Sequence, residues 1–217
     1  MAYNKFAGVY DRLMSDCPYD KWIDFILTKA GDIKEAADGA CGTGNIAQRL
    51  ALKGVKVTAF DISNEMLDLA QEKARKNGLA IRYLQQDLTD FELMHKTELV
   101  TVCCDGINYL IGEGELHSCF ECANRALNEG GMFIFDISSE YKLRHMDGQM
   151  YGDDSEELAY IWNNSIVNDV LELSLSFFCR TNNGLYQRFD EVQFQRAYKY
   201  DEIIKTLEET GFGKIEV

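Results

Sequence analysis

The sequence predicts an α/β fold, in which a doubly wound, mostly parallel sheet carries an inserted antiparallel β meander. Three observations predict it. Strand-like and helical segments alternate from residue 34 to residue 136, a glycine-rich loop follows the first of these strands, and three strand-like segments without intervening helices lie between residues 158 and 198. Such alternation favours right-handed crossovers that place helices on both faces of a parallel sheet.

Each element of the first part has its own local signal. Apolar residues at helical spacing predict a helix over residues 3–14, and a second helix follows from Pro18 to Gly31. Ser63 can cap a helix that stops at Asn77-Gly78. We expect strands at 34–39, 55–61, 81–85, 99–103 and 132–136, and helices between them at 45–53, 64–76 and 113–128.

The pattern changes after residue 137. A polar, turn-rich segment at 138–154 precedes the meander, whose strands we expect at 158–167, 170–180 and 185–198. A last helix is expected at 201–210, and Lys214 to Val217 could begin a strand. The chain therefore divides into a sheet domain of residues 1–137 and 199–217 and an inserted β subdomain of residues 138–198.

Composition limits the classes of partner. With 36 acidic against 22 basic side chains the formal net charge is −14, and this charge disfavours nucleic acid. No apolar run reaches the roughly 18 residues of a membrane span, and the first residues lack the features of a signal peptide, so we expect a cytoplasmic protein without a membrane partner. The seven cysteines are odd in number and irregularly spaced, which is typical of reduced thiols. Cys119-x-x-Cys122 has no second pair at metal spacing, so we expect no metal site.

The stretch from Asp38 to Ile46 has the composition of a loop that holds a nucleotide-type cofactor. Gly42 and Gly44 allow positive φ and leave no Cβ between the backbone and a ligand. A helix that begins near Asn45 aims unpaired N–H groups into the same space. By itself this pattern is compatible with several cofactors.

Acids at the ends of the strands narrow the choice, because ligands on such sheets bind beyond the carboxyl ends of the strands. Asp61 ends the second strand, where a carboxylate can accept hydrogen bonds from vicinal ribose hydroxyls. Asp87 can accept from an exocyclic adenine amine while Leu88 offers an apolar surface to the ring. Either acid alone could be a helix cap, but with the glycine loop they form an ordered set. The acids expected along this edge are Asp38, Asp61, Asp87, Asp105 and Asp136.

This ordered set resembles a known family, the class I S-adenosylmethionine-dependent methyltransferases, which have a Rossmann-like sheet. Their successive motifs are similar to Ala37-Asp-Gly-Ala-Cys-Gly-Thr-Gly44, Phe60-Asp-Ile-Ser63, Gln86-Asp-Leu88 and the strand Leu99 to Asp105. A narrower bacterial group, the YqeM-like methyltransferases, is similar in Tyr3-Asn-Lys-Phe-Ala, Val9-Tyr-Asp-Arg-Leu, Asn108-Tyr-Leu and Arg188-Phe-Asp-Glu191. The resemblance runs over nearly the whole chain and leaves the methyl acceptor open.

The resemblance implies that S-adenosyl-L-methionine is the cofactor, with the backbone of residues 38–44 on its methionine part, Asp61 on the ribose and Asp87 with Leu88 on the adenine. Gly39 and Ala40 depart from the family pattern, which more often has Leu and Gly there, so the approach of the backbone to a ligand at Ala40 is open. The class usually adds a final antiparallel strand, which Lys214 to Val217 could only begin. The implied cofactor-binding residues are Tyr3, Tyr10, Asp38, Gly39, Ala40, Cys41, Gly42, Gly44, Asp61, Ile62, Met66, Asp87, Leu88 and Cys104.

The expected reaction is an in-line displacement that moves the methyl group to a small-molecule acceptor, with the insertion forming part of the acceptor pocket. Positioning of donor and nucleophile can supply most of the acceleration, so a general base is needed only if the acceptor loses a proton. Arg188 and Asp190 could contact a polar acceptor or form a surface ion pair. The candidate catalytic residues are Tyr10, Asp105, Asn108, Tyr109 and Arg188.

Other interpretations remain open. Gly42-Thr-Gly-Asn-Ile-Ala47 also satisfies the G-x-G-x-x-A pattern of NAD-dependent oxidoreductases, although no Tyr-x-x-x-Lys pair accompanies it. The chain could also bind S-adenosylmethionine as a sensor that transfers nothing. Cys104 lies where cytosine-C5 methyltransferases carry a nucleophilic Cys, but it lacks their Pro-Cys context, and a buried thiol is the competing interpretation.

Overall fold

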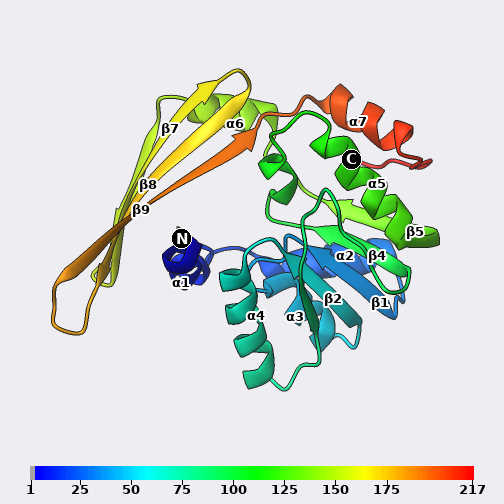
Figure 1. Cartoon of the computed structure of the whole chain (residues 1–217), viewed down its shortest axis with the longest axis horizontal. Helices are drawn as coiled ribbons and strands as arrows, with labels where there is room; N and C mark the ends of the chain where they lie inside the picture. Colours follow the sequence, from blue (N-terminus) through cyan, green and yellow to red (C-terminus); the bar gives the residue numbers. More distant parts are fainter. Residues whose placement is uncertain (1–2) are drawn as a thin grey trace.

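The computed structural model describes residues 3–217, with side chains from Phe6 onward. Figure 1 shows a sheet domain and, beside it, an arm of long strands. In chain order the sheet domain contains α1 (Tyr3–Leu13), α2 (Tyr19–Ala30), β1 (Glu35–Gly39), α3 (Asn45–Leu52), β2 (Lys56–Asp61), α4 (Asn64–Lys76), β3 (Arg82–Gln85), β4 (Thr97–Val102), the 3₁₀ turn η1 (Gly106–Tyr109), α5 (Glu115–Ala126), β5 (Leu127–Phe135) and α7 (Tyr200–Glu209). The arm contains α6 (Glu140–Met146), β6 (Met150–Asp154), β7 (Leu158–Val167), β8 (Val170–Arg180) and β9 (Tyr186–Arg196).

The five strands of the sheet domain are parallel and lie in the order β3-β2-β1-β4-β5. Apolar side chains of α5 and α7, among them Phe120 and Ile203, pack in one cluster with residues of the sheet. Ile23 of α2 and Leu50 of α3 pack in another cluster with other sheet residues. This doubly wound arrangement confirms the predicted fold class. The strand order reverses between β1 and β4, and ligands of such sheets bind at that point.

The arm is a four-stranded antiparallel sheet in the order β6-β7-β8-β9. Its last three strands correspond to the predicted meander. Residues 138–154, which the sequence marks as polar and turn-rich, also form α6 and β6, which were not predicted. Ser139 Oγ caps α6 by accepting a hydrogen bond from Lys142 N–H at 3.2 Å. β6 is an exposed edge strand that contains Gly152 and Asp153, residues of poor strand propensity, so its pairing with β7 and not its own sequence makes it a strand.

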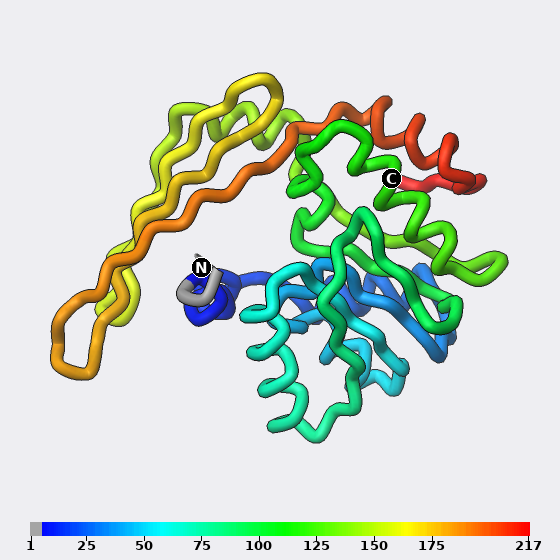
Figure 2. The backbone as a smooth tube through the Cα atoms, in the orientation of Figure 1, coloured from blue at the N-terminus to red at the C-terminus, as the bar shows by residue number. Residues whose placement is uncertain are grey.

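Helix α1 lies between the arm and the sheet domain (Figures 1 and 2). Its Phe6 ring lies 5.9 Å from the Phe177 ring of β8, and both belong to an apolar cluster shared by α1 and the arm. At the other end of the chain, Lys214 to Val217 form no strand; Glu216 instead pairs with Lys29 of α2 at 2.9 Å. None of the described helices has the length and apolar character needed to cross a membrane.

Candidate active site at the carboxyl edge of the parallel sheet

The loop between β1 and α3 has the conformation that the glycine pattern predicts. Gly42 and Gly44 have φ of 52° and 79°. The Asp38 side chain is buried below this loop, where its two oxygens accept hydrogen bonds from Ala47 N–H at 3.0 Å and Thr101 Oγ at 2.8 Å. Because Gly44 has no side chain, Asp38 supplies the cap of α3 from the neighbouring strand. Burial raises the pKa of Asp38 to about 7, although both hydrogen bonds act in the opposite direction.

Both departures from the family pattern have a physical explanation here. A methyl group at Gly39 would lie 2.8 Å from Phe60 Cζ and 2.9 Å from Leu88 Cδ2, so the absence of a side chain lets these two apolar groups pack over β1. Ala40 has φ of 49°, in the left-handed region where glycine is usual. Ala40 thus adopts the left-handed turn that glycine more often makes at this position of the family pattern, at a conformational cost.

Asp61 connects the loop to the end of β2. One carboxylate oxygen accepts a hydrogen bond from Gly42 N–H at 2.7 Å and the other from Ser63 N–H at 2.9 Å. Burial raises the pKa of Asp61, against these two hydrogen bonds. Each oxygen retains a further lone pair, so the carboxylate can also accept hydrogen bonds from a ligand.

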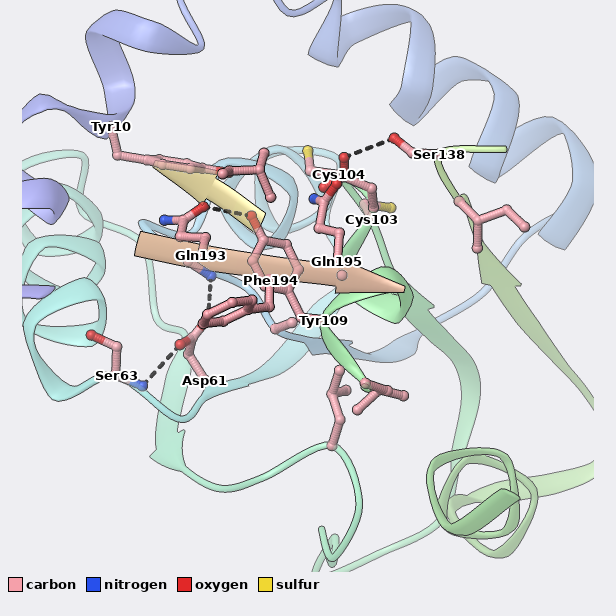
Figure 3. A pocket seen from close by; sticks show the side chains of 18 of the residues that line it. Tyr10, Asp61, Ser63, Cys103, Cys104, Tyr109, Ser138, Gln193, Phe194 and Gln195 are labelled. Carbon is pink, nitrogen blue, oxygen red and sulfur yellow. Dashed lines mark hydrogen bonds between the residues drawn. The ribbon is translucent and has the colours of Figure 1, made fainter. Parts of the chain in front are cut away.

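A cavity of about 910 Å³ opens above this edge, between the sheet domain and β9 of the arm (Figure 3). Nine residues of the sequence-predicted cofactor set line it, and Asp105 and Tyr109 of the catalytic set line it too. Asp38, Gly39, Cys41 and Gly44 do not line this cavity; they lie in β1 and in the loop that follows it. The Tyr3 side chain lies outside the described residues. The lining cofactor candidates are Tyr10, Ala40, Gly42, Asp61, Ile62, Met66, Asp87, Leu88 and Cys104.

Tyr10 brings α1 to the cofactor loop. A methyl group at Gly42 would lie 3.8 Å from Tyr10 Cε1, so the ring and the loop backbone face one another. The Phe6 ring meets the Tyr10 ring edge-on, with the centroids 5.8 Å apart. Burial, reinforced by nearby acidic groups, raises the pKa of Tyr10 and keeps the phenol neutral.

Asp87 and Leu88 follow β3 as expected, with Leu88 buried and Asp87 exposed. One oxygen of Asp87 accepts from Thr89 N–H at 2.8 Å and Thr89 Oγ at 2.7 Å, which closes the turn after the strand. Ile62 is 60% exposed and Met66 is buried beside it on the first turn of α4. Together these residues form the apolar and acidic end of the cavity.

Cys104 and Asp105, in the turn between β4 and η1, both have left-handed φ, of 59° and 53°. Such strain in consecutive non-glycine residues persists only where the surroundings enforce it. Here Asp105 N–H donates to Asp136 Oδ2 at 3.1 Å, and Asp105 Oδ2 accepts from Ser138 Oγ at 3.0 Å. Lys142 Nζ donates to the same hydroxyl at 3.0 Å. The turn thus holds two carboxyl groups side by side at the cavity wall.

Both carboxyl groups have altered acidity. Burial raises the pKa of Asp105, and it raises the pKa of Asp136 to about 6, with the Asp105 charge adding to the effect. Asp136 Oδ1 is buried and has no hydrogen-bond partner among the described residues. Burial also raises the pKa of Cys104, so its thiol stays protonated and is a poor nucleophile.

The remaining catalytic candidates differ in position. Tyr109 lines the cavity and its hydroxyl donates to Gln193 Oε1 of β9 at 2.9 Å. Asn108 is fully buried and bonded to backbone groups of Ser138 and Arg196, so its amide is not available to an acceptor. Arg188 lies outside the cavity lining and pairs with Asp190 at 2.9 Å, which is the surface ion pair that the sequence left as one of two possibilities.

Several residues of the cavity wall were missed as site residues. Asp136, directly after β5, was expected at this edge by the same rule as Asp61 but was given no role in the site. Nothing local distinguishes the others, because they come from the arm and from its connection to the sheet domain (Figure 3). These residues are Ser138, Lys142, Gln193, Phe194 and Gln195.

Comparisons with known proteins agree with this geometry. Residues 36–131 match a family model described as a methyltransferase domain. The putative methyltransferase YqeM of Bacillus subtilis (strain 168) is 37% identical over 98% of this chain and 87% of its own length, and a second of that description, from Geobacillus sp. (strain WCH70), is 37% identical over 100% and 91%. The crystal structure of an S-adenosylmethionine-dependent methyltransferase from Clostridium acetobutylicum ATCC 824 has a TM-score of 0.88 and 39% identity, and covers 97% of this chain and 87% of that one.

Proposed function

Because the chain belongs to the class I S-adenosylmethionine-dependent methyltransferases, we propose that it transfers a methyl group to a small organic acceptor bound between the strand edge and the arm. The observation that carries the proposal is the cavity of about 910 Å³, a size typical of small-molecule sites. Among its described lining residues, Lys142 carries a positive charge against five carboxyl groups, which disfavours a polyanionic acceptor. These carboxyl groups are Asp61, Asp87, Asp105, Glu115 and Asp136.

The residues at one end of the cavity fit the cofactor. Gly42 exposes backbone opposite Tyr10, where no side chain intervenes. The free lone pairs of Asp61 suit ribose hydroxyls, and Asp87 with the neighbouring apolar groups suits an adenine. We infer that Ala40 and Gly42 face the methionine part, Asp61 the ribose, and Ile62, Met66 and Leu88 the ring.

When bound, S-adenosylmethionine supplies a methyl group on a positively charged sulfur, which a nucleophile can displace in line. The protein must then hold the acceptor at near-attack distance, an effect worth about 7–11 kcal/mol in well-oriented systems. The rings of Tyr10 and Tyr109 offer aromatic faces to positive charge. Asp105 and Asp136 can accept a proton from a hydroxyl or ammonium acceptor, because a raised pKa brings a carboxylate closer to neutral pH.

The proposal is tested by incubating the protein with methyl-labelled S-adenosylmethionine and a fractionated cell extract. We expect formation of S-adenosylhomocysteine together with label in the low-molecular-weight fraction. Label confined to protein or nucleic acid would contradict the small-molecule acceptor. Tight binding of S-adenosylmethionine without turnover in any fraction would instead favour the sensor. A preference for NAD in calorimetric titration would contradict the proposal at the cofactor.

A further inference from the structure

Helix α1 is hydrogen-bonded to the cofactor loop, the segment between β1 and α3, by a group of polar side chains that the proposed reaction does not use. Asp11, the residue after Tyr10, accepts hydrogen bonds from Thr43 Oγ at 2.6 Å and Asn45 Nδ2 at 2.9 Å through one oxygen. Its other oxygen accepts from Lys73 Nζ of α4 at 2.7 Å. One carboxylate therefore joins α1, the loop, the first turn of α3 and the last turn of α4.

The side chains of this group are also hydrogen-bonded to one another. Lys73 Nζ also donates to Thr43 Oγ at 3.1 Å and to Asn45 Oδ1 at 3.3 Å. Thr43 is fully buried, whereas the side chains of Asp11 and Lys73 are 45% and 28% exposed. Burial alone would raise the pKa of Asp11, but the hydrogen bonds from Lys73, Thr43 and Asn45 outweigh it and lower the pKa. The carboxylate is thus ionised at neutral pH, as these contacts require.

The position of Asp11 makes it relevant to the cofactor. Adjacent residues of a helix point about 100° apart. Asp11 can therefore bind side chains of the loop while the Tyr10 ring, which points in a different direction, lies against Gly42. Thr43 lies between Gly42 and Gly44, whose left-handed φ values form the turn. A side chain that holds Thr43 and α1 together therefore fixes the distance between the Tyr10 ring and the loop backbone.

We propose that Asp11 is a positioning residue for the cofactor site, which holds α1 against the loop so that Tyr10 covers bound S-adenosylmethionine or S-adenosylhomocysteine and slows its release. The contacts to Lys73 are partly exposed, and ion pairs of this kind are weak. The attachment of α1 through Asp11 thus favours the position in which Tyr10 covers the cofactor. It is also weak enough to break when the cofactor is exchanged. This inference rests on the cofactor that the family uses and not on the proposed acceptor.

The test measures S-adenosylhomocysteine binding and dissociation without any acceptor. Asp11→Asn removes the charge and keeps the size, and we expect a rise in Kd of about three- to tenfold, mostly through faster dissociation. Asp20→Asn is the control, since it removes an ion pair with Arg49 between α2 and α3 in which the Asp20 side chain is 92% exposed and Asp11 takes no part. The control should leave Kd and the dissociation rate unchanged.

A double-mutant cycle separates positioning from general support of the fold. If Asp11 acts through Tyr10, Asp11→Asn should have little further effect on dissociation once Tyr10→Ala is present. Full additivity of the two substitutions, or an unchanged dissociation rate in Asp11→Asn, would overturn the proposal. Lys73→Gln provides a second variant with the same expectation if Asp11→Asn folds poorly.

Hydrogen exchange of α1 amides gives an independent readout. In the wild type, S-adenosylhomocysteine should protect α1, and in Asp11→Asn this protection should fall while that of α5 stays the same. Equal protection of α1 in both proteins would contradict the proposal. If the wild type binds no S-adenosylhomocysteine, the cofactor assignment fails and Asp11 has nothing to position. If binding follows the expectation but no small molecule is methylated, only the acceptor proposal fails.

Discussion

Asn108 and Ser138 hold each other through a reciprocal pair of hydrogen bonds. Asn108 Oδ1 accepts from Ser138 N–H at 2.8 Å, and Asn108 Nδ2 donates to the Ser138 carbonyl at 3.0 Å and to the Arg196 carbonyl at 2.9 Å. Ser138 lies where the chain leaves the sheet domain, and Arg196 ends β9, where the chain returns. One amide therefore clamps both connections of the arm to η1 and fixes the wall of the cavity.

Replacing this amide should loosen the arm. Asn108→Ala takes the side-chain partner from the buried N–H and carbonyl of Ser138, whereas the Arg196 carbonyl still accepts from Tyr198 N–H at 3.1 Å. We therefore expect a loss of about 2–4 kcal/mol in the free energy of unfolding, measured with urea. Asn163→Ala, at an exposed position of β7, is the control and should stay within about 0.5 kcal/mol of the wild type. Equal effects of the two substitutions would show that the clamp contributes nothing.

A methyl group at Gly39 should crowd the sheet. It would meet Phe60 and Leu88 at less than ordinary contact distance, so Gly39→Ala should lower the free energy of unfolding by about 1–3 kcal/mol. Gly8→Ala offers the contrast, because a methyl group there meets no atom within 4 Å and the position is helical. That substitution should stabilise the protein by about 0.5–1 kcal/mol. Thermal and urea unfolding of both variants check the prediction.

Asp38 should make stability depend on pH. Its pKa in the folded protein is about 7, above the ordinary value of 3.8, so the folded state binds the proton more tightly and the free energy of unfolding falls as pH rises between these values. Asp38→Asn does not ionise. Its amide oxygen can accept from Ala47 N–H, and its NH2 group can donate to Thr101 Oγ, whose own hydrogen can then go to the Ala37 carbonyl at 3.3 Å. The difference between variant and wild type should therefore shift in favour of the variant by on the order of 1–3 kcal/mol across this window. Parallel stability curves would contradict the prediction.

Asp136 should control the pH dependence of catalysis if the acceptor loses a proton. A base must be deprotonated to act, so kcat should rise as pH increases through about 6, the pKa of this carboxyl. Asp136→Asn should lower kcat by on the order of 100-fold and remove this step in the profile. Affinity for S-adenosylhomocysteine should not change. An unaltered pH profile in the variant would assign the proton transfer to another group.

Arg188 should prove dispensable for turnover. Its ion pair with Asp190 is 60% and 57% exposed and lies outside the cavity lining, and such pairs contribute about 0–1 kcal/mol. We expect Arg188→Ala to change kcat and KM by less than about twofold. A large rise in KM for the acceptor would show that the arm moves this side chain into the site during catalysis.

The sequence predicted the parallel sheet well because its signals are local. Alternating periodicities, the Asn77-Gly78 stop and the Ser63 cap each identify one element, and α4 begins and ends where they indicate. β6 had no such signal, since an exposed edge strand with Gly152 is defined by its neighbour. Lys214 to Val217 form no strand, and Glu216 in this segment pairs with Lys29, which is distant in the sequence.

In the candidate site, too, some residues follow from local signals and others depend on contacts between distant segments. Asp61 and Asp87 follow from the rule that parallel strands end at one edge, whereas the role of Asn108 depends on where two distant connections meet. Arg188 illustrates a further limit, because residues 192–195 from both faces of β9 line the cavity and Arg188, earlier in the same strand, does not. Alternation along the strand does not tell which stretch of it reaches the cavity. Only the packing of the arm on α1, through Phe6 and Phe177, decides that.

The contact between Phe6 and Phe177 also affects how the protein is made. Helix α1 leaves the ribosome before the other elements of the described chain, yet the β8 residue that covers Phe6 follows it by 171 positions, the difference between residues 177 and 6. Contacts of such long sequence separation form late. During synthesis the apolar face of α1 therefore stays uncovered while the parallel sheet assembles. The acceptor cavity is completed after the cofactor loop has folded.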